Sequence, residues 1–207
     1  FDIELTSGMH SIAVTPSYEL GGVVKTGERT VSDELKAERY YPVPMPLPAT
    51  IAPDAQDADH ITFINVTDDQ TTWDFFDPSY SSDHAKTLRY DYGNYNDGND
   101  WFILPQMLTE AGGAFNLSFG LYAQADRSND LEIFWGTEPT PASMTNLIAA
   151  LEGYAGSGAY EEQSFDFGVP QGSNIYIGVR CKSARGNGYI YIKNISVKVT
   201  SGEAPAA

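Results

Sequence analysis

The 207-residue chain is poor in cysteine, in basic side chains and in long apolar runs. Its single cysteine, Cys181, excludes an intrachain disulfide and a zinc site built from cysteines. Only 12 Lys and Arg stand against 28 Asp and Glu, so the net charge of −16 would repel a nucleic-acid backbone or an anionic membrane surface. No apolar run approaches the roughly 20 residues that span a bilayer. The sequence therefore predicts no nucleic-acid partner and no membrane insertion.

Histidine is also scarce, and the three histidines, His10, His60 and His84, lie in no recognisable catalytic motif. Nucleophilic catalysis requires a base beside the nucleophile, and the G-x-S-x-G turn of α/β hydrolases is absent. Glycosidases hold two catalytic carboxyl groups at a set distance. Among 28 acidic residues some pair will always lie at that distance, so the abundance of acids does not indicate a glycosidase. We therefore expect a protein that is not an enzyme. A jelly-roll hydrolase is the outside hypothesis, and it requires two carboxylates that face each other in a cleft.

What the chain does have is alternation of apolar and polar residues, interrupted by many of its 19 glycines and 12 prolines. Alternation with period two predicts half-buried strands of antiparallel sheets. The strongest candidates are residues 61–66, 100–104, 115–123, 131–135, 174–181 and 189–199. We expect two such sheets packed face to face.

One segment has the spacing of a helix instead. Thr140 can cap it, Pro141 suits the first helical position, and Gly153 can end it. Apolar residues between them recur at intervals of three and four, at Met144, Leu147, Ile148 and Leu151. The predicted fold class is therefore all-β, an antiparallel jelly-roll β-sandwich with one short inserted helix.

A proline run divides the chain. Residues 40–48 carry four prolines at alternating positions, which predicts a semi-rigid, extended linker. A ligand for an SH3-like partner is the other interpretation of this run. We expect a β segment over residues 1–38, the linker over 39–50, the sandwich over 51–200 and a tail over 201–207.

Four stretches of the predicted sandwich follow the motif order of a known family of domains. They are Phe63–Trp73, Asn99–Pro105, Leu131–Met144 and Tyr189–Val197. Together they resemble the cleaved-adhesin, or choice-of-anchor J, jelly-roll domains of secreted Bacteroidetes proteins, over about residues 51 to 200. The resemblance implies an antiparallel jelly roll without catalytic activity. Residues 1–38 resemble the last strands of a preceding fibronectin type III module.

The resemblance also implies a function. We expect a noncatalytic adhesion or carbohydrate-binding module of a secreted or cell-surface bacterial protein, with a glycan or a host or cell-surface protein as its partner. The alternative is a structural spacer or protein-docking module attached to a larger surface enzyme. The spacer hypothesis predicts that the structure exposes no aromatic patch.

Sugar recognition needs exposed rings, because the C–H faces of pyranoses stack on aromatic side chains while polar groups bond the hydroxyls. Two segments, residues 73–80 and 90–95, mix aromatic and polar residues. Plain packing is the alternative for these rings, and Trp101 and Trp135 are expected in the core. The candidate ligand-binding residues are Trp73, Phe76, Tyr80, Tyr90, Tyr92 and Tyr95.

Structural calcium is the cofactor to consider, because hard cations take clustered carboxylate and amide oxygens. Two loops are rich in these groups, around residues 68–69 and 91–100. The resemblance implies a calcium site with an early Asp loop and an acid in the last strand, but Lys193 and Asn194 stand where an Asp pair is common. Asn-rich turns without a cation are the alternative. The candidate metal ligands are Asp68, Asp69, Asp97 and Asn194.

Two further features have structural interpretations. Cys181 falls on the apolar face of its strand, which predicts a buried, inert thiol. Arg180, Lys182 and Arg185 form a local basic cluster. In so acidic a chain we expect this cluster to pair with carboxylates, and an anionic-ligand site is the alternative.

Overall fold

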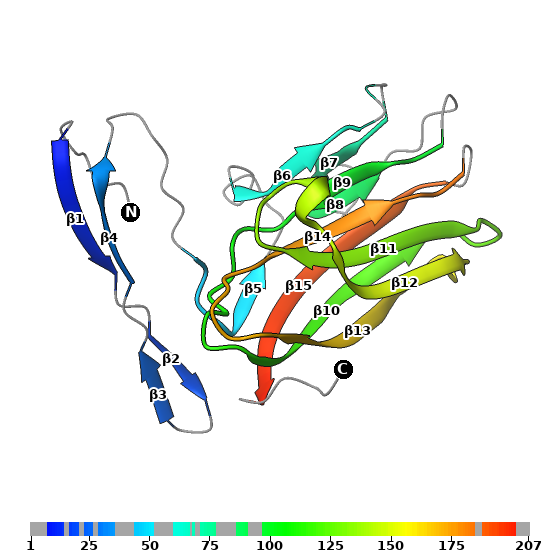
Figure 1. The fold of residues 1–207 in the computed structure, drawn as a ribbon. Coiled ribbons are helices and arrows are strands. Elements are labelled where there is room, and N and C mark those ends of the chain that lie inside the picture. Colours follow the sequence, from blue (N-terminus) through cyan, green and yellow to red (C-terminus); the bar gives the residue numbers. More distant parts are fainter. Residues whose placement is uncertain are drawn as a thin grey trace.

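The protein, as seen in a computed structural model, is a sandwich of two antiparallel sheets (Figure 1). The structure describes residues 8–14, 17–20, 23–26, 29–35, 44–51, 60–66, 68, 71–77, 86–90, 97–184 and 188–201. The six-stranded sheet has the order β13 (Tyr160–Val169), β10 (Gly113–Ala123), β15 (Ile190–Ser201), β8 (Thr87–Tyr90) and β7 (Trp73–Phe76), with β5 (Ala49–Ile51) also paired to β15. The five-stranded sheet has the order β12 (Asn146–Tyr154), β11 (Asn129–Gly136), β14 (Tyr176–Cys181), β9 (Asp100–Ile103) and β6 (Thr62–Ile64). The all-β antiparallel sandwich is confirmed, and its jelly-roll connectivity stays a prediction.

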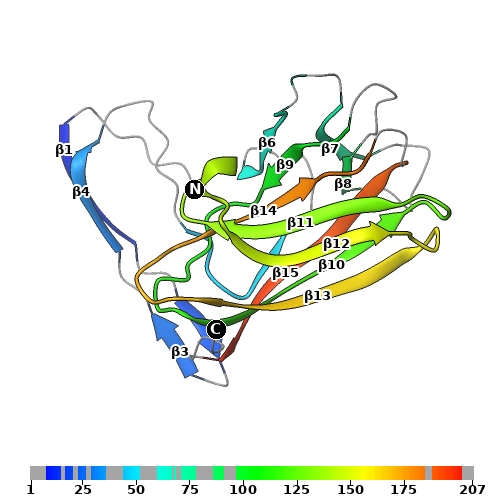
Figure 2. The ribbon, with the colours of Figure 1, turned by 45° about the vertical axis from the view of Figure 1, so that its right-hand side comes forward.

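The N-terminal part forms two small two-stranded sheets. One pairs β1 (Gly8–Val14) with β4 (Arg29–Leu35), and the other pairs β2 (Ser17–Leu20) with β3 (Val23–Thr26). Figures 1 and 2 both draw these strands to one side of the sandwich. Their relation to a fibronectin type III module, like the other predicted domain boundaries, stays a prediction.

The core lies between the two large sheets and follows the alternation of the sequence. In β10 the buried side chains are Phe115, Leu117, Phe119 and Leu121, each 2% exposed or less. In β14, Cys181 is buried with the apolar side chains two and four residues before it. Because successive side chains of a strand point to opposite faces, the residues between these face outward. No helix among the described residues is long and apolar enough to cross a membrane.

The short helix predicted after Thr140 is wrong. In its place the structure has a three-residue 3₁₀ turn, η2 (Pro141–Ser143), and strand β12 begins at Asn146. The Ser143 hydroxyl oxygen accepts hydrogen bonds from two backbone N–H groups that precede the turn, at 3.0 and 2.9 Å. The turn is therefore closed by a serine side chain and does not continue into a helix.

Bulges in β12 explain the helix-like spacing. Phe134 pairs with Leu147, but Ile133 pairs with Ala149, so Ile148 is an extra residue in the ladder. A second register shift lies further along the same strand pair. Each bulge adds one residue and inverts the alternation of the faces that follow it. The bulge therefore lets Ile148 and Leu151, three residues apart, both pack against the core, whereas Leu147 is 57% exposed.

Part of the predicted linker packs into the sandwich. Met45 donates its N–H to the Gln106 carbonyl at 2.6 Å, and its own carbonyl accepts the Leu108 N–H at 2.8 Å. Leu47 is 1% exposed and belongs to the core. Residues 44–50, the described part of that linker, are thus held by the sandwich, and the last two of them already belong to β5.

Candidate functional site

The outer face of the six-stranded sheet carries a row of side chains that runs across its strands. Tyr160 on β13 lies opposite Tyr122 on β10, which lies opposite Tyr191 on β15, which lies opposite Arg89 on β8. Residues directly opposite each other on antiparallel strands share a face. The row faces away from the core, because the neighbour Leu121 points into it.

The rings of this row touch one after another. Ring centroids are 5.6 Å apart for Tyr160 and Tyr122, 5.5 Å for Tyr122 and Tyr191, and 5.6 Å for Tyr191 and Phe76. Tyr189 stacks on Tyr191 at 6.0 Å. Tyr191 is only 7% exposed and forms the base, whereas the other four rings are half-buried. These five residues are called the aromatic row below.

A charged side chain flanks each end of the aromatic row. The Arg89 guanidinium lies 4.2 Å from the centre of the Phe76 ring, and its Nε donates to Asp74 Oδ1 at 3.0 Å. A second Arg89 nitrogen donates to the other Asp74 oxygen, so the pair is bidentate. At the other end, Lys193 Nζ lies 3.6 Å from the centre of the Tyr160 ring. Both contacts are in the range of cation–π interactions.

Gly120 leaves space beside the row. It lies opposite Lys193 on one neighbouring strand and Glu162 on the other. A Cβ at this position would lie 3.5 Å from Lys193 Cγ and 3.6 Å from Tyr160 Cδ1. The face thus combines flat apolar rings with donors and acceptors at their sides, which is the combination that binds a partly apolar, hydroxylated ligand.

Two of the predicted ligand-binding rings are core residues, and that prediction is corrected. Trp73 is 1% exposed and Tyr90 is 3% exposed. Both are fixed by Asp100, whose backbone carbonyl accepts the Trp73 Nε1–H and whose carboxylate accepts the Tyr90 hydroxyl, each at 3.1 Å. Neither ring offers a face to a ligand. Phe76 belongs to the aromatic row, while three candidates lie outside the described residues: Tyr80, Tyr92 and Tyr95.

Four of the five rings in the aromatic row are not among the residues predicted from the sequence. Tyr122 stands between inward-facing Leu121 and Ala123, and Tyr191 stands between Ile190 and Ile192, all of them buried. The available signal was this alternation itself, which places each tyrosine on the outer face. The four missed rings are Tyr122, Tyr160, Tyr189 and Tyr191.

The predicted metal ligands are spread over two sheets. Asp68 and Asp97 are exposed and flank strands of the five-stranded sheet. Asn194 is exposed on β15 of the other sheet, at a bulge where its φ of 55° is one that asparagine tolerates. Asp69 lies outside the described residues. Among residues the structure describes, no three His, Cys, Asp or Glu could hold a metal ion. The calcium site stays a prediction, and Asn194 is explained by the bulge.

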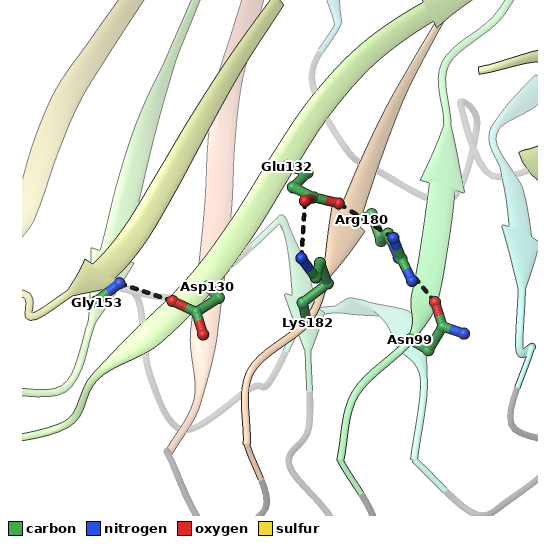
Figure 3. A network of polar contacts seen from close by, with 6 residues as sticks. All are labelled: Asn99, Asp130, Glu132, Gly153, Arg180 and Lys182. Atoms are coloured by element: carbon green, nitrogen blue, oxygen red, sulfur yellow. Dashed lines mark hydrogen bonds and ion pairs between the residues drawn. The ribbon is translucent and has the colours of Figure 1, made fainter. Parts of the chain in front are cut away.

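The basic cluster pairs with a carboxylate, as predicted. Glu132 on β11 accepts hydrogen bonds from Arg180 Nη1 at 3.1 Å and from Lys182 Nζ at 2.8 Å, on the outer face of the five-stranded sheet (Figure 3). Arg180 Nε also donates to Asn99 Oδ1 at 2.7 Å. Arg185 lies outside the described residues. The two described cations are therefore satisfied by the protein itself.

Cys181 is a buried thiol, as predicted. It is fully buried, and burial raises the pKa of the thiol from its ordinary value of 9.0 to about 12. Its Sγ donates to the Ser183 hydroxyl at 3.3 Å. Because the thiolate is the reactive form, this residue is inert at neutral pH.

The sandwich has a cleaved-adhesin-type fold. The K2 cleaved adhesin domain of Lys-gingipain superposes with a TM-score of 0.58 at 12% identity, over 73% of this chain and 99% of that domain. The K1 domain from Porphyromonas gingivalis W83 gives 0.52 at 15% identity, over 68% and 90% of the two chains. The K3 domain from the same organism gives 0.51 at 12% identity, over 67% and 91%. No protein-family model and no curated protein matches the sequence.

Proposed function

We propose that this protein is a noncatalytic carbohydrate-binding module of a secreted or cell-surface protein, with a jelly-roll sandwich as its scaffold. The aromatic row is its binding site. The observation that carries this proposal is the row itself, in which rings from β7, β10, β13 and β15 follow one another across one outer face. The cleaved-adhesin-type fold supports a noncatalytic binding module in general.

The chemistry of the row suits a sugar. A pyranose presents a C–H face that packs on a ring and hydroxyls that need donors and acceptors at its edge. Asp74 and Arg89 at one end, and Lys193 and Glu162 near the other, supply both kinds of group. Because the rings are fixed by each other and by the sheet, little ordering entropy opposes binding.

The spacer hypothesis fits less well. It predicts that no aromatic patch reaches the surface. Four half-buried rings on one face, among them Tyr122 and Tyr160, favour a binding surface over a passive connector.

The test is a glycan array probed with the purified protein, with and without calcium. We expect binding to at least one glycan class, and a loss of about tenfold or more in affinity, which is 1.4 kcal/mol, for Tyr122→Ala. Tyr122→Phe keeps the ring and should keep binding. Tyr176→Ala is the matched control, because Tyr176 is a half-buried tyrosine of β14 in the other sheet. No binding above background, or equal losses for Tyr122→Ala and Tyr176→Ala with both variants folded, overturns the proposal.

A further inference from the structure

The aromatic row has a regular repeat. Four rings, from Tyr160 through Tyr122 and Tyr191 to Phe76, follow one another at centroid separations of 5.6, 5.5 and 5.6 Å. The row runs across the strands, whose own spacing is about 4.8 Å, and its last step, from Tyr191 on β15 to Phe76 on β7, passes over β8. This repeat is close to the advance of one sugar per step along an extended oligosaccharide chain. A linear glycan can therefore follow the row, with the half-buried rings of Tyr160, Tyr122 and Phe76 as contacts and the nearly buried Tyr191 beneath them.

The row also has two ends. Its outer members, Tyr160 and Phe76, lie on β13 and β7, which are the two edge strands of the sheet. A cation from an inner strand lies over one face of each terminal ring, Lys193 of β15 over Tyr160 and Arg89 of β8 over Phe76. The face therefore accommodates about one sugar for each of its three half-buried rings, and sugars beyond the edge strands contact no ring.

The rings are tilted relative to each other and do not form a flat platform. Their planes meet at 52° for Tyr160 and Tyr122, at 68° for Tyr122 and Tyr191, and at 44° for Tyr191 and Phe76. A flat crystalline sugar surface would need coplanar rings to contact several of them at once. Tilted rings fit a single chain whose successive sugars rotate about their linkages.

The charges beside the row are balanced. Arg89 is paired with Asp74, and one cation and one acid, Lys193 and Glu162, lie opposite Gly120 on its two neighbouring strands. The whole chain carries a net charge of −16, which repels a polyanion at long range. Nothing in this arrangement favours uronic acids or sulfated sugars over neutral ones.

We infer that the aromatic row binds a neutral, linear glycan as a single soluble chain lying across the strands, in which about four sugars span the row and the half-buried rings of Tyr160, Tyr122 and Phe76 make the contacts. This inference rests on the proposed function. It specifies the length, the charge class and the physical form of the ligand, and each of these three properties is tested separately.

The experiment is titration calorimetry of the folded protein with cello-, xylo-, manno- and laminari-oligosaccharides of one to six units. For the series that binds, affinity should rise by about tenfold or more from two units to four and then level off. Equal affinity for the monosaccharide and the hexasaccharide would contradict the inferred length. Binding on the array to branched or acidic glycans alone overturns the inference and leaves the proposed function in place.

Two variants locate the chain on the row. Tyr160→Ala removes a terminal ring, so it should cancel the gain from the last bound sugar and weaken the tetrasaccharide more than the disaccharide. Tyr122→Ala removes a central ring and should weaken every length, while Tyr160→Phe should behave as the unchanged protein. The same loss at all lengths for both alanine variants contradicts one sugar per ring. Polygalacturonate and insoluble crystalline cellulose are the negative probes, and binding to either above the neutral soluble chains overturns the inference.

Discussion

Tyr122 and Tyr191 lie directly opposite each other on β10 and β15, with ring centroids 5.5 Å apart and ring planes at 68°. This edge-to-face contact joins the two halves of the aromatic row, because Tyr191 continues to Phe76 and Tyr122 continues to Tyr160. Tyr191 is nearly buried, so it supports its neighbours more than it meets a ligand. The pair therefore has both a structural and a positioning role.

The first prediction is an energetic coupling between these two rings. Aromatic pairs on sheets contribute about 0.5–1.5 kcal/mol beyond the area they bury. Urea unfolding of Tyr122→Ala, Tyr191→Ala and the double variant should give a coupling free energy in that range. A matched cycle on Tyr122 and Tyr176, which lie in different sheets, should give none. A coupling near zero for Tyr122 and Tyr191 would show that the contact does not hold the row together.

The second prediction separates core tyrosines from those of the aromatic row. Tyr90 donates its hydroxyl to the buried Asp100 carboxylate, which also accepts the Val66 N–H at 2.8 Å. Tyr90→Phe removes one donor from a fully buried acid, so the free energy of unfolding should fall by about 1–3 kcal/mol. Glycan affinity should not change, because the ring faces the core. A loss of glycan affinity in the folded Tyr90→Phe variant would show that Tyr90 belongs to the ligand-binding site after all.

The third prediction concerns alkaline stability and Cys181. Burial holds the pKa of this thiol near 12 in the folded protein, against an ordinary 9.0. The folded state therefore keeps a proton that the unfolded state releases above pH 9. The stability that this thiol contributes is present below that pH and is lost progressively as the pH rises toward 12.

Cys181→Ala isolates this effect from tyrosine titration. The difference in unfolding free energy between the unchanged protein and the variant should be constant near neutral pH and shrink as the pH rises above about 9. In the same pH range, a thiol reagent should modify native Cys181 only as fast as the protein opens. Rapid labelling of the native protein at neutral pH would contradict the buried position of the thiol.

The strands could be predicted from sequence because burial alternates along each of them. Phe115, Leu117 and Phe119 show the pattern without interruption, and the structure keeps it. The pattern failed where bulges shifted it, as at Ile148 in β12, since a period-two signal with an inserted residue resembles a helical one. Sequence spacing alone does not distinguish these two cases.

The aromatic row could not be predicted as a site, because its members come from four strands far apart in the chain. Tyr122 and Tyr160 meet only through the β10–β13 register, and Tyr191 only through β10–β15. Local mixtures of aromatic and polar residues identified Phe76 but also favoured Trp73, whose side chain is buried in the core. Register between distant strands, and not local composition, assembles this surface.

The last prediction tests the ion pairs of Glu132, which accepts from both Arg180 and Lys182 (Figure 3). The side chains are 19–42% exposed, so solvent screens both pairs and the contribution of each is small. Glu132→Gln should lower the free energy of unfolding by about 1 kcal/mol at low salt, and high salt should reduce this difference.

Glu152→Gln is the matched control, because Glu152 is an exposed acid on the neighbouring strand β12, and it should change stability little. Glycan affinity should be the same in both variants, since the Glu132 network and the aromatic row lie on the outer faces of different sheets. A loss for Glu132→Gln that persists undiminished in high salt would indicate that packing of the Arg180 and Lys182 side chains, and not charge, stabilises this face.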